Sequence, residues 1–395
     1  MMRAVIIVDG VRTPIGRMGG ALSPFRPEEL AAFALKGLLE KTGIDPVIVD
    51  DILIGHACTQ NAAVNIARWA ALKAGFPVSV PAQTVERQCG SSLQAVNSAA
   101  TSIIAGFGEV YVAGGCESWS NAPFLMERQR VPFSLVPPAY IKREVGPTEE
   151  YDVPMGIVAE IIGDTWSISR EEQDRFALQS QRKAVQAIER GFFREEIVPV
   201  SVPQRKGDPV VFDRDEHPRE TSLEKLASLK PAFKKGGTVT AGNSSGLNDG
   251  GVALLLMSKE KSDALGFKGL GRFVTFALSG VEPKYMGIAP VDAIQKALAR
   301  ANLGIEQMDV IECNEAFASQ TLGVMKELSK RGLKIEEEKW NPNGGAIAFG
   351  HPNGMSGGRL ALAVLNQLKR TGGRYGLATL CIGGGQGIAT IFERI

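Results

Sequence analysis

An internal repeat constrains the fold of this chain more than any other feature, because both halves show the same order of strand-like and helix-like segments. In the first half, a β-branched stretch is followed by a helix-like segment and then by VIVDDILIG at 47–55. In the second half, the same order leads to MDVIECNEAF at 308–317. Each half then has a long helix and a strand that runs into glycines, at 110–118 and at 378–387. Chance similarity between αβ units is the alternative, but four elements in matching order favour a duplication.

Short β-branched runs alternate with segments of helical periodicity along the chain, which is typical of an α/β protein with a layered, largely buried sheet. The predicted strands cover Ala4–Val8, Val49–Ile54, Glu109–Ala113, Arg272–Ala277, Asp309–Glu312 and Leu377–Ile382. The predicted helices cover Pro27–Thr42, Ala62–Ala74, Gly90–Ala105, Arg170–Arg190, Pro290–Ala301 and Ser356–Arg370.

The segment between the two halves has a different composition. It is rich in proline and mixed charges, and it contains one strongly amphipathic helix pattern. This composition favours a loop-rich insert that serves as a lid or substrate-binding layer. We therefore expect a first half at 1–117 that is completed by about 250–270, an insert at 118–249 and a second half at 271–395.

The composition excludes several classes of function. Hydrophobic residues make up 44% of the chain and charged residues 22%, which supports a globular core. The 44 basic and 43 acidic residues nearly cancel, so the balance does not suggest a nucleic-acid-binding protein. Five scattered cysteines and three distant histidines predict neither a disulfide framework nor a metal site. The lack of an export signal and of a long apolar run indicates a cytoplasmic protein that does not enter a membrane.

The segment VERQCGSSLQAV at 85–96 holds the first candidate catalytic residue. Apolar residues at helical spacing follow its charged turn, so Cys89 is predicted at the N-terminus of a helix. The exposed N–H groups and the positive end of the helix dipole favour thiolate over thiol there. A buried structural cysteine is the alternative, but Gly90 and the two serines after it keep the approach open.

A second candidate is His351, in the glycine-rich segment NPNGGAIAFGHPNGMSGGR at 341–359. Histidine exchanges protons near neutral pH without a large shift of its pKa. Glycines on both sides, such as Gly350 and Gly354, would let the backbone and a ligand approach closely. An incidental histidine in a turn-rich loop is the alternative.

Three further candidates are Cys381, Asn314 and Ser245. Cys381 leads into the glycine run of LCIGGGQG at 380–387, whose N–H groups can form a nest that stabilises an anion. A small core residue at a strand end is the alternative for Cys381. Asn314 follows a predicted strand, and it either caps the next helix or holds a water molecule. Ser245 lies in TVTAGNSSGLNDGG at 238–251, which is either an ordinary turn or a ligand contact.

Taken together, these segments resemble the thiolase family over nearly the whole chain. Three motifs agree in order and spacing, VERQCGSSLQAV, NPNGGAIAFGHPNGMSG and GLATLCIGGGQG, and two more are NEAF and TAGNSSGLNDG. The resemblance implies duplicated βαβαβαββ halves that form a five-layer α-β-α-β-α core with an inserted loop domain. It also implies an acyltransferase of fatty acid metabolism, including β-oxidation, that forms homodimers or homotetramers.

The resemblance implies a two-step acyl exchange. Cys89 would attack an acyl-CoA thioester after His351 takes its proton, which gives an acyl-enzyme and free CoA. Cys381 would then remove an α-proton from a second acetyl-CoA, and the enolate would attack the acyl group. In reverse, CoA would cleave a 3-ketoacyl-CoA. His351 and a water held by Asn314 would stabilise the enolate oxygen, and the N–H groups of Cys89 and Gly383 would form a second oxyanion hole.

Coenzyme A is implied as substrate and product, with no permanently bound cofactor and no metal. Ser245 matches a residue that contacts pantetheine, and Arg219 lies where an adenine-stacking arginine is expected. Met155, Met286 and Phe317 match residues of the family's substrate pocket.

Two positions depart from the family pattern. Glu86 stands where the nucleophile motif normally has Asn, Ser or Thr, and its carboxylate would either raise the pKa of Cys89 or form a salt bridge. Pro154 replaces a histidine that is usual in acetoacetyl-specific members, and 124–153 lacks the familiar loop sequence. Both departures leave room for longer or unusual acyl chains.

Other classes of function remain as alternatives. A weakly catalytic acyl-CoA or lipid carrier could share the fold, although the intact Cys89, His351 and Cys381 count against it. A ketosynthase-like condensing enzyme would lack the second cysteine, so Cys381 discriminates against that class. A redox protein is a poor fit because no resolving cysteine lies close in sequence to Cys89.

Overall fold

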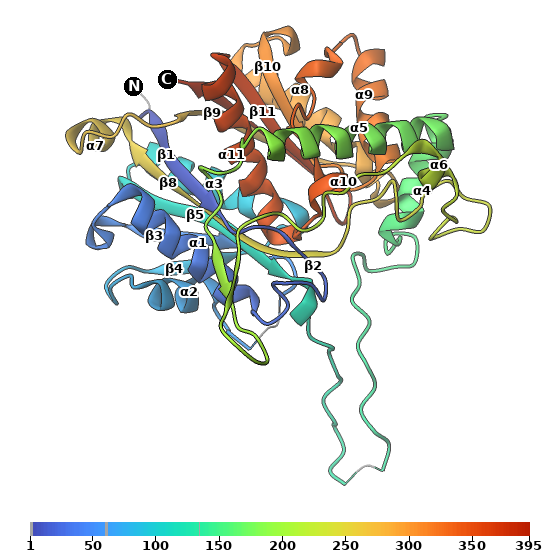
Figure 1. The fold of residues 1–395 in the computed structure, drawn as a ribbon, viewed down its shortest axis with the longest axis horizontal. Helices are drawn as coiled ribbons and strands as arrows, with labels where there is room; N and C mark the ends of the chain where they lie inside the picture. The colour runs from blue at the N-terminus through green and yellow to red at the C-terminus, as the bar shows by residue number, and fades with distance from the viewer. Residues whose placement is uncertain (1–2, 60–61, 134) are drawn as a thin grey trace.

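The two halves of the chain fold alike, as predicted (Figure 1). The computed structural model describes residues 3–59, 62–133 and 135–395. The first half supplies β1 (Val5–Arg12), α1 (Pro27–Thr42), β3 (Asp51–Gly55), α2 (Ile66–Ala74), β4 (Ala82–Val85), α3 (Ser91–Ala105), β5 (Val110–Ser118) and β8 (Asn248–Ser258). The second half supplies β9 (Gly271–Gly280), α8 (Ala289–Ala301), β10 (Met308–Cys313), α9 (Ala318–Lys330), α11 (Asn353–Thr371), β11 (Tyr375–Ile382) and β12 (Gln386–Arg394). A single parallel bridge between Ile311 and Trp340 takes the place that β4 has in the first half.

Hydrogen bonds join the strands of both halves into one ten-stranded sheet of the described residues. Its order is β4-β3-β5-β8-β1 in the first half and β10-β11-β12-β9 in the second half. The halves meet where β1 pairs antiparallel with β9 over Val5–Ile7. A two-residue strand, β2 (Gly16–Arg17), adds to β8. Equivalent strands therefore occupy equivalent positions in the two halves, which is what a duplication produces.

The first-half strands and the second-half strands of this sheet form two β layers, with helices between them and on both outer faces. Three hydrophobic clusters lie between these five layers. The central cluster unites both halves through buried side chains that include Leu93 of α3, Leu254 of β8, Leu365 of α11 and Leu380 of β11. A second cluster packs α1 and α2 on the outer face of the first half, and a third packs α8 and α9 on the outer face of the second. Each fully buried Leu or Ile contributes roughly 1.5–3 kcal/mol of hydrophobic free energy. The predicted five-layer α-β-α-β-α core is confirmed.

The insert between β5 and β8 crosses the second half and also carries a long arm (Figure 1). Its elements are η3 (Trp119–Asn121), α4 (Met155–Thr165), α5 (Arg170–Glu189), β6 (Val200–Val202), β7 (Val210–Phe212) and α6 (Leu223–Ala227). The start of α5 is fixed by a capping box, in which Ser169 and Glu172 each accept a hydrogen bond from the other's backbone N–H. The arm, made of 122–133 and 135–150, extends away from the body and exposes large apolar side chains. No helix of the described residues is both long and apolar enough to cross a membrane.

Several elements differ from the sequence expectation. The small-residue segment at 238–251 was expected to be a turn, but β8 begins inside it at Asn248. Asn, Asp and Gly disfavour strands, yet all eleven residues of β8 are buried between β1 and β5, so sheet pairing outweighs local propensity. The edge strand β4, the C-terminal strand β12, α4 and α9 were not predicted. Short connecting elements complete the chain: η1 (Pro46–Ile48), η2 (Gln88–Gly90), α7 (Lys259–Ala264), η4 (Pro283–Ile288), η5 (Ile305–Gln307), η6 (Glu337–Lys339) and α10 (Ala346–Phe349).

Glu312 of β10 makes the stability of this core depend on pH. Its side chain is buried, and neither carboxylate oxygen has a hydrogen-bond partner among the described residues. Burial raises the pKa of Glu312 to about 7 from 4.5, although the positive charge of Arg359 opposes the shift. The folded state therefore binds more protons than the unfolded state between these two pKa values. The free energy of unfolding should fall as pH rises through this window, by about 3 kcal/mol in all.

We expect Glu312→Gln to remove this loss, because the amide does not ionise. Urea unfolding of the wild type and of the variant at about pH 5 and about pH 8 measures how much unfolding free energy each protein loses between the two pH values. The wild type should lose more stability than the variant between the two pH values. Equal losses would show that Glu312 does not titrate in this window, whatever the absolute stability of the variant.

Candidate active site

Cys89 lies in a tight turn at the start of α3. The turn η2 precedes the helix, and Gln88 has a left-handed backbone conformation with φ of 43°. Such a conformation costs a residue with a side chain roughly 1–3 kcal/mol and needs support from its surroundings. Glu86 provides it, since one carboxylate oxygen accepts hydrogen bonds from the Gln88 backbone N–H at 2.7 Å and from its side-chain amide at 2.8 Å. Glu86 therefore holds the turn that presents Cys89.

The sulfur of Cys89 accepts two hydrogen bonds from other segments. The side-chain amide of Asn353 donates to Sγ at 3.0 Å, and the backbone N–H of Gly383 donates as well. Desolvation nevertheless raises the pKa of the Cys89 thiol above its usual value. The two hydrogen-bond donors oppose this rise, and the negative charge of Glu117 adds to it. The expectation that the helix N-terminus leaves Cys89 as a thiolate is therefore wrong for the resting site. A proton acceptor beside the sulfur is required.

His351 has the tautomer that such an acceptor needs. Ser356 donates its hydroxyl hydrogen to the carbonyl of Pro352 at 3.0 Å, so its Oγ accepts from Nδ1–H of His351 at 2.6 Å. Nε2 then carries the lone pair, which faces the side-chain amides of Asn314 at 3.3 Å and Asn353 at 3.4 Å. Burial, together with the positive charge of Arg359, lowers the pKa of His351 to about 3. The imidazole is thus neutral at physiological pH, with Nε2 free to accept a proton.

The glycines around His351 allow close packing of the backbone. A Cβ on Gly354 would lie 2.3 Å from the carbonyl oxygen of Cys116, so this glycine lets α11 approach β5. Gly350 has a positive φ of 95°, and a Cβ there would collide with the side chain of Asn248. The expectation that these glycines let the backbone approach closely is therefore confirmed, and the close approach of a ligand stays a prediction.

Cys381 lies near the end of β11, just before the turn that joins β11 to β12. It is fully buried, and burial together with the nearby Cys89 raises the pKa of its thiol. The same apolar cluster contains the buried Met286 and the partly buried Met155 and Phe317. The three predicted pocket residues therefore pack around the second cysteine.

Asn314 does not cap a helix, because α9 begins four residues later with Phe317 as its N-cap residue. Its side chain is buried and faces His351, and its Oδ1 has no hydrogen-bond partner among the described residues. The helix-cap reading of Asn314 is thus wrong. A side-chain oxygen that lacks a protein partner suits a residue that holds water.

A cavity of about 410 Å³ opens onto Cys89. Gly383, Met155 and Asn353 share its wall, and the arm contributes further lining residues from Ile141 to Val145. Ser245 is half-buried, and its backbone N–H donates to the carbonyl of Ala316. This contact places Ser245 beside the NEAF segment.

Arg219 lies apart from the cysteines. It borders a separate cavity of about 280 Å³ along α5, and its backbone N–H donates to Gln181. The structure therefore brings His351, Asn314, Gly383 and the three pocket residues together near the two cysteines, places Ser245 beside the NEAF segment, and leaves Arg219 on a separate surface.

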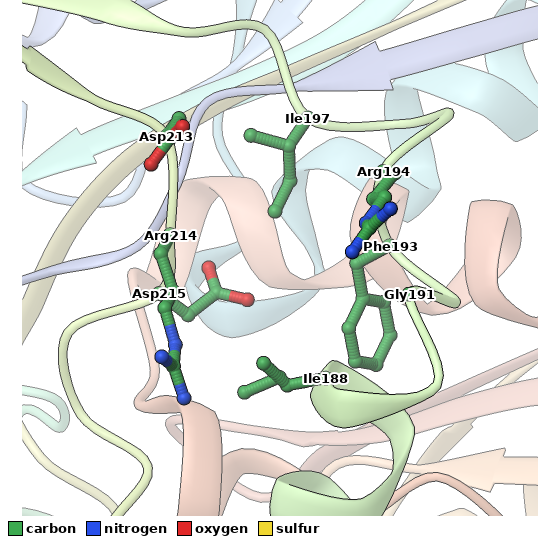
Figure 2. Close-up of a pocket in the computed structure, with 8 residues that line it drawn as sticks. All are labelled: Ile188, Gly191, Phe193, Arg194, Ile197, Asp213, Arg214 and Asp215. Carbon is green, nitrogen blue, oxygen red and sulfur yellow. The ribbon is translucent and has the colours of Figure 1, made fainter.

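Another cavity, of about 440 Å³, lies between the end of α5 and the loop around Asp215 (Figure 2). It contains none of the predicted residues. Asp215 at its wall forms a bidentate pair with the buried Arg12, which also binds Glu196. These charges are paired within the protein, so the wall is structural. The described residues contain no cluster of His, Cys, Asp or Glu that could hold a metal ion.

Sequence reasoning missed Asn353, Ser356 and Glu117. Glu117 accepts hydrogen bonds from the backbone N–H groups of Cys58 and Gly354 and pairs with His56 at 3.0 Å, so it ties the start of α11 to the loop after β3. Asn353 and Ser356 lie two and five residues after His351, and their spacing on the first turns of α11 was the available signal.

Comparison with known proteins identifies the family. The chain matches the models for "Thiolase, N-terminal domain" at residues 5–260 and "Thiolase, C-terminal domain" at residues 267–394. It is 49% identical over 394 residues to an acetyl-CoA acetyltransferase of Chromobacterium violaceum, with 99% of each chain covered. It is 47% identical over 406 residues to the 3-oxoadipyl-CoA/3-oxo-5,6-dehydrosuberyl-CoA thiolase of Escherichia coli, with 100% of both covered. The crystal structure of human mitochondrial 3-ketoacyl-CoA thiolase in complex with CoA matches with a TM-score of 0.91 at 39% identity, covering 100% of this chain and 98% of that one. The chain therefore belongs to the thiolase family of acyltransferases.

Proposed function

We propose that this thiolase exchanges acyl groups between thioesters through Cys89, with His351 and Cys381 as its proton-transferring partners. One observation carries the proposal: Sγ of Cys89 and the lone pair of His351 Nε2 both lie within hydrogen-bond distance of the same Asn353 nitrogen. The second thiol, Cys381, is buried next to the first. A nucleophile, a neutral base and a second acid–base group thus meet at one end of the cavity.

In the first step, the Cys89 proton moves to Nε2 of His351 and the sulfur attacks the thioester carbonyl. The carbonyl π electrons move to oxygen, where the backbone N–H groups of Cys89 and Gly383 stabilise the charge. The intermediate collapses, the bond from carbon to the CoA sulfur breaks, and the CoA thiolate takes up the proton. Both thioesters have similar energy, so this step is reversible.

In the second step, the Cys381 proton passes to Nε2 of His351, and the Cys381 thiolate removes a proton from the α-carbon of acetyl-CoA. The enolate oxygen is stabilised by His351 and by a water that Asn314 holds. The carbanion attacks the acyl group on Cys89, a carbon–carbon bond forms, and the Cys89 sulfur leaves and takes the proton from Nε2 of His351. The reverse sequence is thiolysis, the step that shortens a 3-ketoacyl-CoA in β-oxidation.

The substrates in this proposal are CoA and acyl-CoA, and no permanently bound cofactor takes part. The human relative was crystallised with CoA, which supports this class of substrate. We assign pantetheine contacts to Ser245 and adenine stacking to Arg219. Met155, Met286 and Phe317, which pack around Cys381, are assigned to the acyl pocket.

A panel of 3-ketoacyl-CoA substrates of graded length tests the proposal. We expect CoA-dependent loss of the 3-keto absorbance with acetoacetyl-CoA and with longer chains, because Pro154 replaces the usual histidine and the cavity of about 410 Å³ admits more than an acetyl group. A 3-ketoacyl-CoA that ends in a carboxylate belongs in the panel, since the Escherichia coli relative is named for such substrates. Binding of CoA without cleavage of any substrate would indicate a carrier, and condensation that requires malonyl-CoA would indicate a ketosynthase.

We also propose that the chain forms a homodimer or homotetramer and works in the cytoplasm. Among the described residues, β4 pairs only with β3 at the edge of the sheet, and the arm exposes Phe124, Phe133 and Leu135 almost completely. A second copy of the chain would cover both surfaces. Cys89, Cys116, Cys313 and Cys381 are free thiols, which suits a reducing compartment. Light scattering that returns the mass of a single chain would contradict the oligomer.

A further inference from the structure

Two hydrogen bonds connect Trp119 to the sulfur of Cys89 through Asn353. The indole Nε1–H of Trp119 donates to Oδ1 of Asn353 at 2.7 Å, and Nδ2 of Asn353 donates to Sγ of Cys89 at 3.0 Å. An indole can only donate, so it must face the amide oxygen. The amide orientation is thereby fixed, and its N–H groups point toward the sulfur.

The backbone holds both residues in place. Asn353 is the first residue of α11, and the next residue, Gly354, donates its N–H to the buried carboxylate of Glu117 at 3.0 Å. Trp119 opens η3, directly after β5. Both side chains line the cavity that opens onto Cys89. The pair therefore reaches the reacting sulfur from two rigid elements.

We propose that Asn353 stabilises the anionic sulfur of Cys89 and that Trp119 is a positioning residue that keeps the Asn353 amide turned toward it. The inference rests on the proposed role of Cys89 as nucleophile. An N–H donor strengthens its hydrogen bond when the acceptor becomes charged. When the proton moves from Sγ to His351 Nε2, the amide of Asn353 gains an anionic acceptor. The same nitrogen lies 3.4 Å from Nε2, so Asn353 bridges the proton donor and the proton acceptor.

Several other groups face the sulfur and set the background of its titration. Some lie close to the sulfur, namely Glu117, His351 and Cys381, and others line the cavity onto which it opens, namely Cys58, Lys142, Arg143 and Glu144. Each proposed variant leaves all of them unchanged. A difference between variant and wild type therefore reports the amide and the indole alone.

The pH dependence of Cys89 alkylation by iodoacetamide, read by peptide mass mapping, tests the inference without any assay of thiolase activity. Asn353→Leu keeps the volume and removes the donor, and Trp119→Phe keeps the ring and removes the indole N–H. We expect Asn353→Leu to raise the midpoint of the pH profile of Cys89 alkylation by about one pH unit, which slows alkylation roughly tenfold near neutral pH. Trp119→Phe should shift the midpoint in the same direction by less, and it also tests the inference if the Leu variant does not fold.

The matched control is Asn343→Leu, which makes the same exchange and removes one amide hydrogen bond, to Gln367, without contacting Cys89. Its profile should overlay that of the wild type. An unshifted profile in both Asn353→Leu and Trp119→Phe would overturn the inference. If the wild type cleaves no 3-ketoacyl-CoA but the profiles still shift, the proposed function fails while Asn353 still acts on the sulfur.

Discussion

Cys89→Ser should abolish acyl-enzyme formation and lower the rate of thiolysis by at least about 10³-fold. The pKa of the Cys89 thiol is already raised by desolvation, and the site ionises it only through the neutral His351 beside it. An alkoxide forms much less readily than a thiolate, so the same imidazole cannot activate serine to a useful extent. An acyl-serine would also be an oxygen ester, which is more stable than a thioester, so passing the acyl group on to CoA would become uphill.

Intact-protein mass spectrometry after incubation with an acyl-CoA measures this effect directly. The wild type should gain the mass of one acyl group, and Cys89→Ser should gain none. Cys58 is the informative comparison, because it is a second thiol in the wall of the same cavity. Acylation that persists in Cys89→Ser and disappears in Cys58→Ser would assign the nucleophile to Cys58 and contradict the mechanism.

Local signals in the sequence predicted elements whose ends are fixed by local chemistry. The bounds of α1 match the prediction because Pro27 begins the helix and Gly43 ends it in a left-handed conformation. The strand β8 was missed because Asn248 to Gly251 pair through distant segments, not through their own propensity. Local signals therefore predicted α1 well, but they missed the helices α4 and α9 and the central strand β8.

In the candidate site, too, local motifs predicted some features, and others arise only from the fold. Motifs located Cys89, His351 and Cys381, and the fold brings all three close together. The charge state of Cys89 was predicted in the wrong direction, because desolvation depends on the second half of the chain, which packs against the turn. Asn353 could not be recognised as a partner of Cys89, since only the crossing of α11 and α3 places its amide on a sulfur 264 residues earlier.

The roles of the two cysteines should become distinguishable when Cys381 is changed to serine. Acyl-enzyme formation needs only Cys89 and His351, so Cys381→Ser should still gain one acyl group in the mass spectrum. Carbon–carbon bond exchange needs a group that moves the α-proton, and its rate should fall by about 10²–10⁴-fold. Burial and the nearby Cys89 raise the pKa of Cys381, which favours the protonated thiol that delivers a proton to the enolate in thiolysis.

The control for this variant is Cys313→Ser, because Cys313 is an equally buried thiol whose Sγ faces the carbonyl of Asn314. Exchange of the acetyl-CoA methyl hydrogens with deuterated water isolates the proton transfer from the condensation that follows. That exchange should be lost in Cys381→Ser and kept in Cys313→Ser. A Cys381→Ser enzyme that condenses at the wild-type rate would show that another group moves the α-proton, and His351 would then have to remove that proton as well.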